Sequence, residues 1–129
     1  MMATSAWERW YLGGKLAAAR AEIALATESP EAAAEWAQKA VEMALSVRRA
    51  KYEAVARATL GKALQALGSG DRAREEMRAA IRIADRLGTP ALRWRFRGDL
   101  AALLYAGGDD GGAEVLFGEA GAIIREVEA

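Results

Sequence analysis

The strongest constraint on the fold is a repeat of forty residues that runs along the chain. Shifted by forty positions, the second and third copies align without a gap. The aligned pairs include Leu60 with Leu100, Leu64 with Leu104, Gly68 with Gly108, Ala73 with Ala113 and Ile83 with Ile123. The first copy matches less well, because Arg20 stands where the other copies have leucine. A fixed period of this length indicates a protein built from stacked repeats.

Each copy is predicted to form two helices. Alanine is abundant, there are only two prolines, and no segment alternates as a half-buried strand does. Short breaks at 27–31, 68–71 and 107–110 place glycine at helix ends and Ser or Asp at helix starts. Thr89 is predicted to cap the helix that Pro90 begins. The expected helices lie near 5–26, 31–48, 51–67, 71–87, 90–106 and 111–127.

Apolar stripes on these helices predict how they pack. The stripe of the fourth helix contains Ala73, Met77, Ala80, Ile81, Ala84 and Leu87, and that of the sixth contains Ala113, Leu116, Phe117, Ala120, Ile124 and Val127. A single striped helix cannot bury its apolar face alone, so neighbouring hairpins must stack. We therefore expect one all-α domain over residues 1–129, a right-handed stack of three helix-turn-helix hairpins with repeats near 7–48, 50–88 and 89–128.

The repeat resembles the tetratricopeptide repeat (TPR). The residues that carry the resemblance are Leu60, Gly61, Leu64, Ala73, Met77 and Ala80, and in the third copy Leu100, Ala101, Leu104, Ala113, Phe117 and Ala120. In that family the small residues lie where paired helices approach most closely. The resemblance thus implies that Gly61, which costs about 1 kcal/mol in a helix interior, is a packing residue.

Three departures from the TPR pattern narrow the resemblance. Arg57 and Arg97 stand where an aromatic residue often opens the pattern, the usual closing proline is missing, and the repeat has about forty residues instead of thirty-four. Long repeats of this kind look like those in helical regions of large bacterial signal-transduction ATPases, nucleotide cyclases and transcription activators. The resemblance therefore implies a role in bacterial signalling or regulation.

Residue usage argues against an enzyme. Cysteine and histidine are absent, which removes most zinc chemistry and every Cys or His nucleophile or base. Asp99, Asp109 and Asp110, and the pair Glu75 and Glu76, read as caps or solvated ion pairs, and no Gly-rich phosphate loop is present. We expect no catalytic, metal-binding or cofactor-binding residue. The longest uncharged run is too short for a membrane span and the start lacks a signal peptide, so we expect a cytoplasmic protein.

Charge is segregated along a chain whose net charge is zero. Residues 48–97 carry thirteen basic and five acidic groups, whereas residues 98–129 carry one and seven. The most regular feature is a basic stripe on the fourth helix, formed by Arg74, Arg78, Arg82 and Arg86. The stripe is either a solvated outer face or a binding site for an acidic surface. In the first case, Asp71, Glu75 and Asp85 reduce the repulsion between its arginines. The interleaved acids and neutral total disfavour nucleic acid as the partner.

The TPR resemblance implies a non-catalytic scaffold for a protein or peptide partner, with a groove lined by the first helix of each hairpin. The groove positions are Lys15, Ala18, Glu22 and Leu25, then Val55, Ala58, Lys62 and Gln65, then Arg95, Gly98, Ala102 and Tyr105. We expect Lys62, Gln65, Arg95 and Tyr105, with Trp94 at the edge, to contact an acidic or aromatic peptide. These residues could instead solvate an empty groove or pack against another copy of the chain. The alternative function is a small-molecule or nucleotide-sensing domain of a larger signalling protein.

The ends of the stack are candidates for self-association. The last helix carries Val115 and Ala122 away from its stripe and Ile123 at the stripe's edge, and a solenoid normally ends in a polar face. We therefore expect a homodimer through the terminal helices, or a neighbouring domain in that place. At the other end, Trp7, Trp10 and Tyr11 are expected either to cap the first hairpin or to form a partner site.

Overall fold

A computed structural model describes residues 6–27 and 29–128, and side-chain environments from residue 13 onward. That part of the chain forms six helices and no strand. They are α1 (Ala6–Ala26), α2 (Pro30–Ser46), α3 (Ala50–Ala66), α4 (Gly70–Leu87), α5 (Pro90–Ala106) and α6 (Asp110–Glu128). Every predicted helix is confirmed, with ends within two residues of those expected. The side chains of Trp7, Trp10 and Tyr11 lie outside the described environments.

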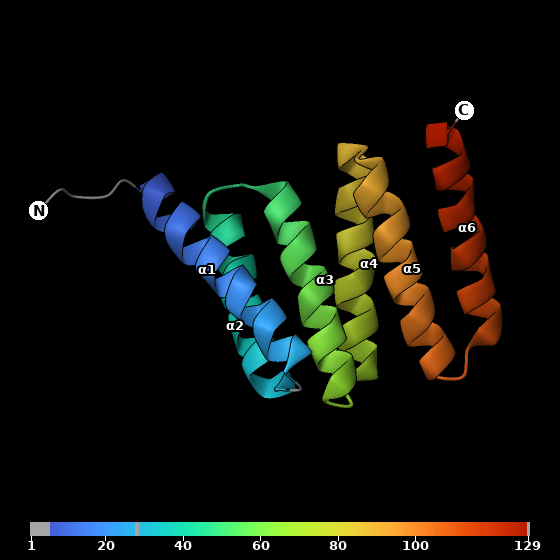
Figure 1. The fold of residues 1–129 in the computed structure, drawn as a ribbon, viewed down its shortest axis with the longest axis horizontal. Helices are drawn as coiled ribbons and strands as arrows, with labels where there is room; N and C mark the ends of the chain where they lie inside the picture. Colours follow the sequence, from blue (N-terminus) through green and yellow to red (C-terminus); the bar gives the residue numbers. More distant parts are fainter. Residues whose placement is uncertain (1–5, 28, 129) are drawn as a thin grey trace, which may run out of the picture.

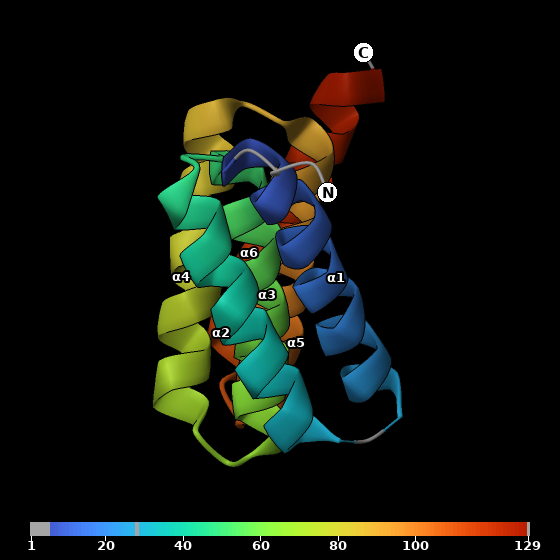
Figure 2. The same ribbon diagram turned by 90° about the vertical axis from the view of Figure 1, so that its left-hand side faces the viewer.

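The helices form three hairpins that stack along one axis. Figure 1 shows the hairpins side by side, with α1 at one end and α6 at the other. Each helix packs on the next along the chain, and α3 also touches both α1 and α5. Viewed along the stack, α1 and α4 lie on opposite sides (Figure 2). The odd-numbered helices therefore form one continuous layer, and the even-numbered helices lie outside it.

The turns explain where the helices end. Gly68, Gly88 and Gly108 all have positive φ, as predicted for glycine after a helix. Arg48, which lies forty positions before Gly88, also has a positive φ, of 55°. Among the described residues, it is the one residue other than glycine with a positive φ. The predicted N-caps are partly wrong. Ser29, Ser69 and Thr89 hold the cap positions without a side-chain cap bond, whereas the Asp109 carboxylate accepts a bond of 2.9 Å from the amide of Gly112.

The core is built largely from alanine between closely spaced helices. The main cluster joins the middle and last hairpins, and its fully buried large side chains include Phe96 and Met77. Gly61 of α3 faces α4, where an added Cβ would lie 3.1 Å from the carbonyl oxygen of Ala73 and 3.5 Å from Cε of Met77. The prediction that Gly61 serves close helix packing is confirmed.

Arg57 ties the two helices of the middle hairpin together. Its guanidinium donates to Glu53 of α3 at 2.7 Å and to Glu76 of α4 at 2.9 Å. Burial by itself would lower the pKa of Arg57, but the two carboxylates raise it above its ordinary value. The residue that replaces the aromatic of the TPR pattern therefore joins α3 to α4 by polar contacts.

Arg97 has a similar role in the last hairpin and also reaches the hairpin before it. Its guanidinium donates to Asp85 of α4 at 2.8 Å and to Glu119 of α6 at 3.0 Å, with the side chain only 12% exposed. Arg93 of α5 adds a second contact to Asp85 at 3.1 Å. The hydrogen bond from Arg97 lowers the pKa of Asp85. This network links three successive helices.

The predicted stripe of the last helix is only half correct. Ala113, Ala120 and Ile123 are buried against α5, so Ile123 belongs to the core and not to the stripe's edge. Phe117, Ile124 and Val127 are exposed instead. Their exposure follows from their place at the end of the stack, because no further helix of the described chain packs on this side of α6.

Candidate binding groove

A pocket of about 280 Å³ lies between α1 and α3, on the layer of odd-numbered helices. Its lining comprises Gly14, Lys15, Ala18, Ala19, Glu22, Ala40, Lys51, Tyr52 and Val55. The small residues of α1 keep the floor open, since alanine and glycine side chains do not reach across the gap between helices. Charged and aromatic side chains surround this floor.

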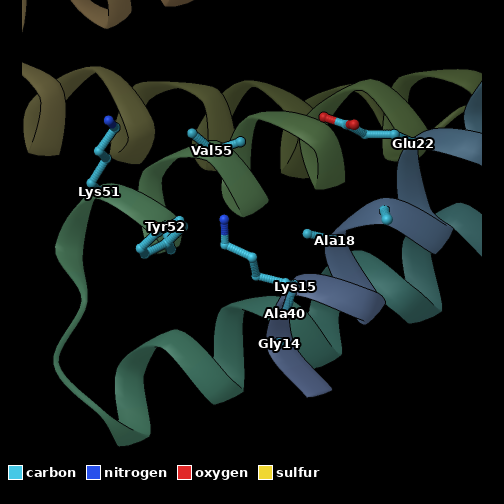
Figure 3. Close-up of a pocket in the computed structure, with 9 residues that line it drawn as sticks. Gly14, Lys15, Ala18, Glu22, Ala40, Lys51, Tyr52 and Val55 are labelled. Atoms are coloured by element: carbon cyan, nitrogen blue, oxygen red, sulfur yellow. The ribbon is translucent and has the colours of Figure 1, made fainter. Parts of the chain in front are cut away.

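The polar groups of this pocket have an ordered arrangement. Lys15 extends from α1 toward α3, and its Nζ lies 5.4 Å from the centre of the Tyr52 ring (Figure 3). Lys51 lies on α3 beside Tyr52, while Glu22 stands at the opposite end of the pocket. One end therefore combines two cations and an aromatic ring, and the other end carries a carboxylate. Such an arrangement suits an acidic or aromatic side chain near Tyr52.

Four of the twelve predicted groove positions line this pocket, namely Lys15, Ala18, Glu22 and Val55. Sequence reasoning placed no binding role on Lys51 or Tyr52. A signal was present: Tyr52 occupies the repeat position held by Leu92 in the third copy, where the leucine is buried. The replacement of a core leucine by a tyrosine marks the place where the packed surface gives way to a pocket.

The residues singled out on α3 and α5 lie further along the same layer. Lys62 bridges these two helices, with its Nζ 3.4 Å from Oδ2 of Asp99. Oε1 of Gln65 is buried without a hydrogen-bond partner in the described part of the chain. Beyond them, Tyr105 is 66% exposed and Trp94 is exposed at the edge.

Arg95 completes this set of residues on α5. Its guanidinium lies 6.0 Å from the ring centre of Phe96, and the residue is exposed. Ala58, a predicted groove position, is instead buried in the core. The pocket itself is lined by residues of α1, α2 and α3 and by none of α5.

The basic stripe lies on the outer face of α4. Arg74 pairs with Asp71, while Arg78, Arg82 and Arg86 make no ion pair within residues 13–27 and 29–128. The expectation that Asp85 relieves the stripe is wrong, because its carboxylate turns to Arg93 and Arg97 of α5. The stripe is therefore more strongly cationic than the sequence pattern predicted.

Two of the stripe arginines border an open groove between α4 and α6. Arg78 and Arg82 line it together with Leu100 and Leu104 of α5. The preceding repeat forms an equivalent groove over Leu60 and Leu64, where Gln38 and Glu42 take the arginine positions. The two outer grooves thus share a leucine floor and differ in the charge of their walls.

Within residues 6–27 and 29–128, no group of three or more carboxylate, histidine or cysteine side chains could hold a metal ion. No helix in the same range is long and apolar enough to cross a bilayer.

Comparison with solved structures identifies the architecture. The chain is similar to the crystal structure of the TPR domain of Arabidopsis FLU, with a TM-score of 0.82 over 91% of this chain and 98% of that chain. The chain has the TPR fold. Sequence identity to that domain is 20%, so the likeness shows the fold alone. No protein-family model matches the chain, and no curated protein matches it. The predicted TPR resemblance and the all-α right-handed stack are confirmed by the solved structure.

Proposed function

We propose that this chain is a non-catalytic module that binds a protein or peptide partner through the layer of odd-numbered helices. The observation that carries the proposal is the pocket between α1 and α3, where Lys15 reaches toward Tyr52 and Lys51 lies beside it. Folds of this type commonly present a concave surface for binding, because each repeat adds one helix to it. An acidic or aromatic side chain of the partner occupies the pocket.

The pocket of about 280 Å³ accommodates one large side chain of an extended segment. The alternative function is the sensing of a nucleotide or other small molecule in the same pocket, because small ligands usually occupy pockets of about 300–1,000 Å³.

The remainder of the partner would run along α3 and α5. Lys62 and Arg95 supply positive charge there, and Tyr105 and Trp94 supply exposed aromatic surface. The proposed site therefore binds an acidic segment that carries at least one aromatic residue. We place the module in cytoplasmic bacterial signalling or regulation, on the strength of its long repeat.

The experiment begins with isolation of the partner by affinity capture and mass spectrometry, followed by calorimetric titration of the purified partner. The double variant Lys15→Glu with Lys51→Glu reverses the charge at the pocket and should weaken binding at least tenfold. Arg95→Glu with Lys62→Glu should have an effect of the same direction.

A matched control is the double variant Arg78→Glu with Arg82→Glu, which makes the same charge change on the outer face. If the control abolishes binding and the pocket variant does not, the basic stripe is the site and the groove assignment is wrong. A thermal-shift screen with nucleotides and metabolites tests the alternative function. A saturable shift that Lys15→Glu removes would favour the sensing role.

A further inference from the structure

The last helix exposes two apolar side chains at repeat positions that are buried elsewhere. Phe117 and Ile124 of α6 are 51% and 36% exposed. Their equivalents in the first two copies are at most 1% exposed: Ala37, Ala44, Met77 and Ala84. In α2 and α4 this side of the helix is covered by the following hairpin. We call Phe117 and Ile124 the C-terminal end face.

The first helix shows the complementary pattern. Leu16 and Ile23 of α1 are 50% and 62% exposed. Their equivalents in the second and third copies are at most 8% exposed: Ala56, Ala63, Phe96 and Leu103. We call Leu16 and Ile23 the N-terminal end face. The two residues are seven positions apart, as are Phe117 and Ile124, so each pair lies on one side of its helix.

The junctions between hairpins inside the chain show what covers these positions. At the α4–α5 junction, one core cluster holds both sets of equivalents, Met77 and Ala84 of α4 with Phe96 and Leu103 of α5. At the α2–α3 junction, Ala56 and Ala63 of α3 pack with Ala40, Val41 and Ala33 of α2. The α6 equivalents of those three α2 residues lie on the same side of the helix as Phe117 and Ile124. The two end faces therefore belong to the helix sides that meet where one hairpin joins the next.

We propose that the C-terminal end face of one copy packs on the N-terminal end face of a second copy, so that the helical stack continues from chain to chain. The four apolar side chains would leave water together, which is the driving force of the inner junctions as well. They are bulkier than the alanines of the α2–α3 junction. The spacing between α6 and the second α1 is therefore wider than at that junction.

Charge selects this head-to-tail arrangement over a symmetric one. α1 carries three basic and two acidic residues, whereas α6 carries one basic and five acidic residues. An α6–α6 contact would bring two acidic helices together, which opposes association. The α6–α1 contact joins helices of opposite net charge. Because the two faces differ, the contact is heterologous and extends to chains of more than two copies.

Sedimentation equilibrium of this 129-residue chain tests the proposal, over concentrations from about 10 µM to about 1 mM, where contacts of small area become populated. The wild type should show a mass that rises with concentration beyond that of a dimer. Ile23→Glu and Phe117→Glu each place a charge in one face and should each weaken self-association at least tenfold. Both positions are exposed, so circular dichroism melts should match the wild type.

Mixing the two variants gives the decisive result. Ile23→Glu keeps an intact C-terminal end face, and Phe117→Glu keeps an intact N-terminal end face. An equimolar mixture should form a dimer of twice the 13.8 kDa chain mass and nothing larger. Val115→Glu is the matched control, because Val115 is also exposed on α6, at 62%, but lines the outer groove. It should associate as the wild type does.

Three outcomes would overturn the proposal. A wild type that stays monomeric over the whole range shows that a second copy does not cover these faces, and a further hairpin or a different protein becomes the occupant to test. Self-association that persists in Ile23→Glu but not in Phe117→Glu shows a symmetric contact between α6 helices. Loss of association in Val115→Glu with retention in Phe117→Glu places the contact on the outer groove.

Discussion

Gly61 and Ala73 mark the closest approach of α3 and α4, because a Cβ atom at position 61 would lie 3.1 Å from the carbonyl oxygen of Ala73. That oxygen belongs to a helix backbone and cannot rotate away as a side chain can. In the third copy the equivalent position is Ala101, which is fully buried. The last hairpin has room for a methyl group at this position, whereas in the middle hairpin the two helices are too close for one.

We therefore predict that Gly61→Ala lowers the free energy of unfolding by about 1 kcal/mol, since overpacking outweighs the gain in helix propensity. Gly118→Ala is the control. Gly118 lies inside α6 with no atom near an added Cβ, so the same change should raise the free energy of unfolding by about 0.5–1 kcal/mol. Urea titration measures both, and a stabilised Gly61→Ala would contradict the packing role.

Much of the fold was predictable because the repeat shows each structural position more than once. Leu60 and Leu100 are both buried, and Gly68 and Gly108 both adopt positive φ. When the same residue type recurs every forty positions, its burial or backbone conformation can be predicted from the sequence. One failure lies where this redundancy ends. Phe117 belongs to the same stripe as Met77, yet it is exposed because no further helix of the described chain packs on that side of α6.

The proposed site was less predictable, because Tyr52, which lines its pocket, departs from the repeat. Tyr52 differs from Leu92, and that difference gains meaning only when Lys15 of α1 is seen to approach the ring. Likewise, sequence neighbours suggested that Asp85 relieves the arginines of its own helix. The carboxylate reaches α5 instead, since helix spacing along the chain does not reveal which side chains meet across a hairpin junction.

Arg48 adopts the left-handed conformation that Gly88 adopts at the next junction, and the left-handed region costs a non-glycine residue roughly 1 kcal/mol. We predict that Arg48→Gly raises the free energy of unfolding by about 0.5 kcal/mol, after the greater flexibility of glycine in the unfolded chain is offset.

Arg48→Ala removes the same charge without relieving the backbone, so it should give no gain. Gly88→Ala should lower the free energy of unfolding by about 1 kcal/mol, as the converse change. Thermal melts by circular dichroism compare the three. Equal stabilisation by Arg48→Gly and Arg48→Ala would assign the effect to charge and not to backbone strain.

Asp85 should make stability depend on acid pH. Arg97 donates to its carboxylate and lowers its pKa below the ordinary value of 3.8. A group with a depressed pKa in the folded state adds stability that is complete above its unfolded pKa and is lost as the pH falls through the folded pKa. We therefore expect the free energy of unfolding to decline as the pH drops below about 4, and Asp85→Asn to reduce that decline.

The control for this effect is Asp71→Asn, because the Asp71 side chain is 94% exposed. Its contact with Arg74 lies within one helix and joins no two hairpins. Urea titrations between pH 2.5 and pH 7 measure the pH dependence of each variant. An Asp85→Asn profile with the same acid limb as the wild type would show that other carboxylates govern the decline.

Variants of Lys62 test whether a residue of the proposed groove also stabilises the contact between α3 and α5. Its ammonium group bridges α3 to Asp99 of α5, and both side chains are only partly exposed. We predict that Lys62→Ala lowers the free energy of unfolding by about 0.5 kcal/mol, since partly exposed ion pairs contribute little. A double-mutant cycle with Asp99→Asn should give a coupling energy of similar size, because the two groups are direct partners.

The functional consequence depends on how the partner meets this pair. An acidic segment that contacts Lys62 competes with Asp99 for the ammonium group, so Asp99→Asn should tighten binding of that segment while Lys62→Ala weakens it. Titration calorimetry with the captured partner measures both affinities. If Asp99→Asn weakens binding as much as Lys62→Ala does, the bridge acts by holding α3 and α5 at their spacing, and Lys62 is a positioning residue without direct contact.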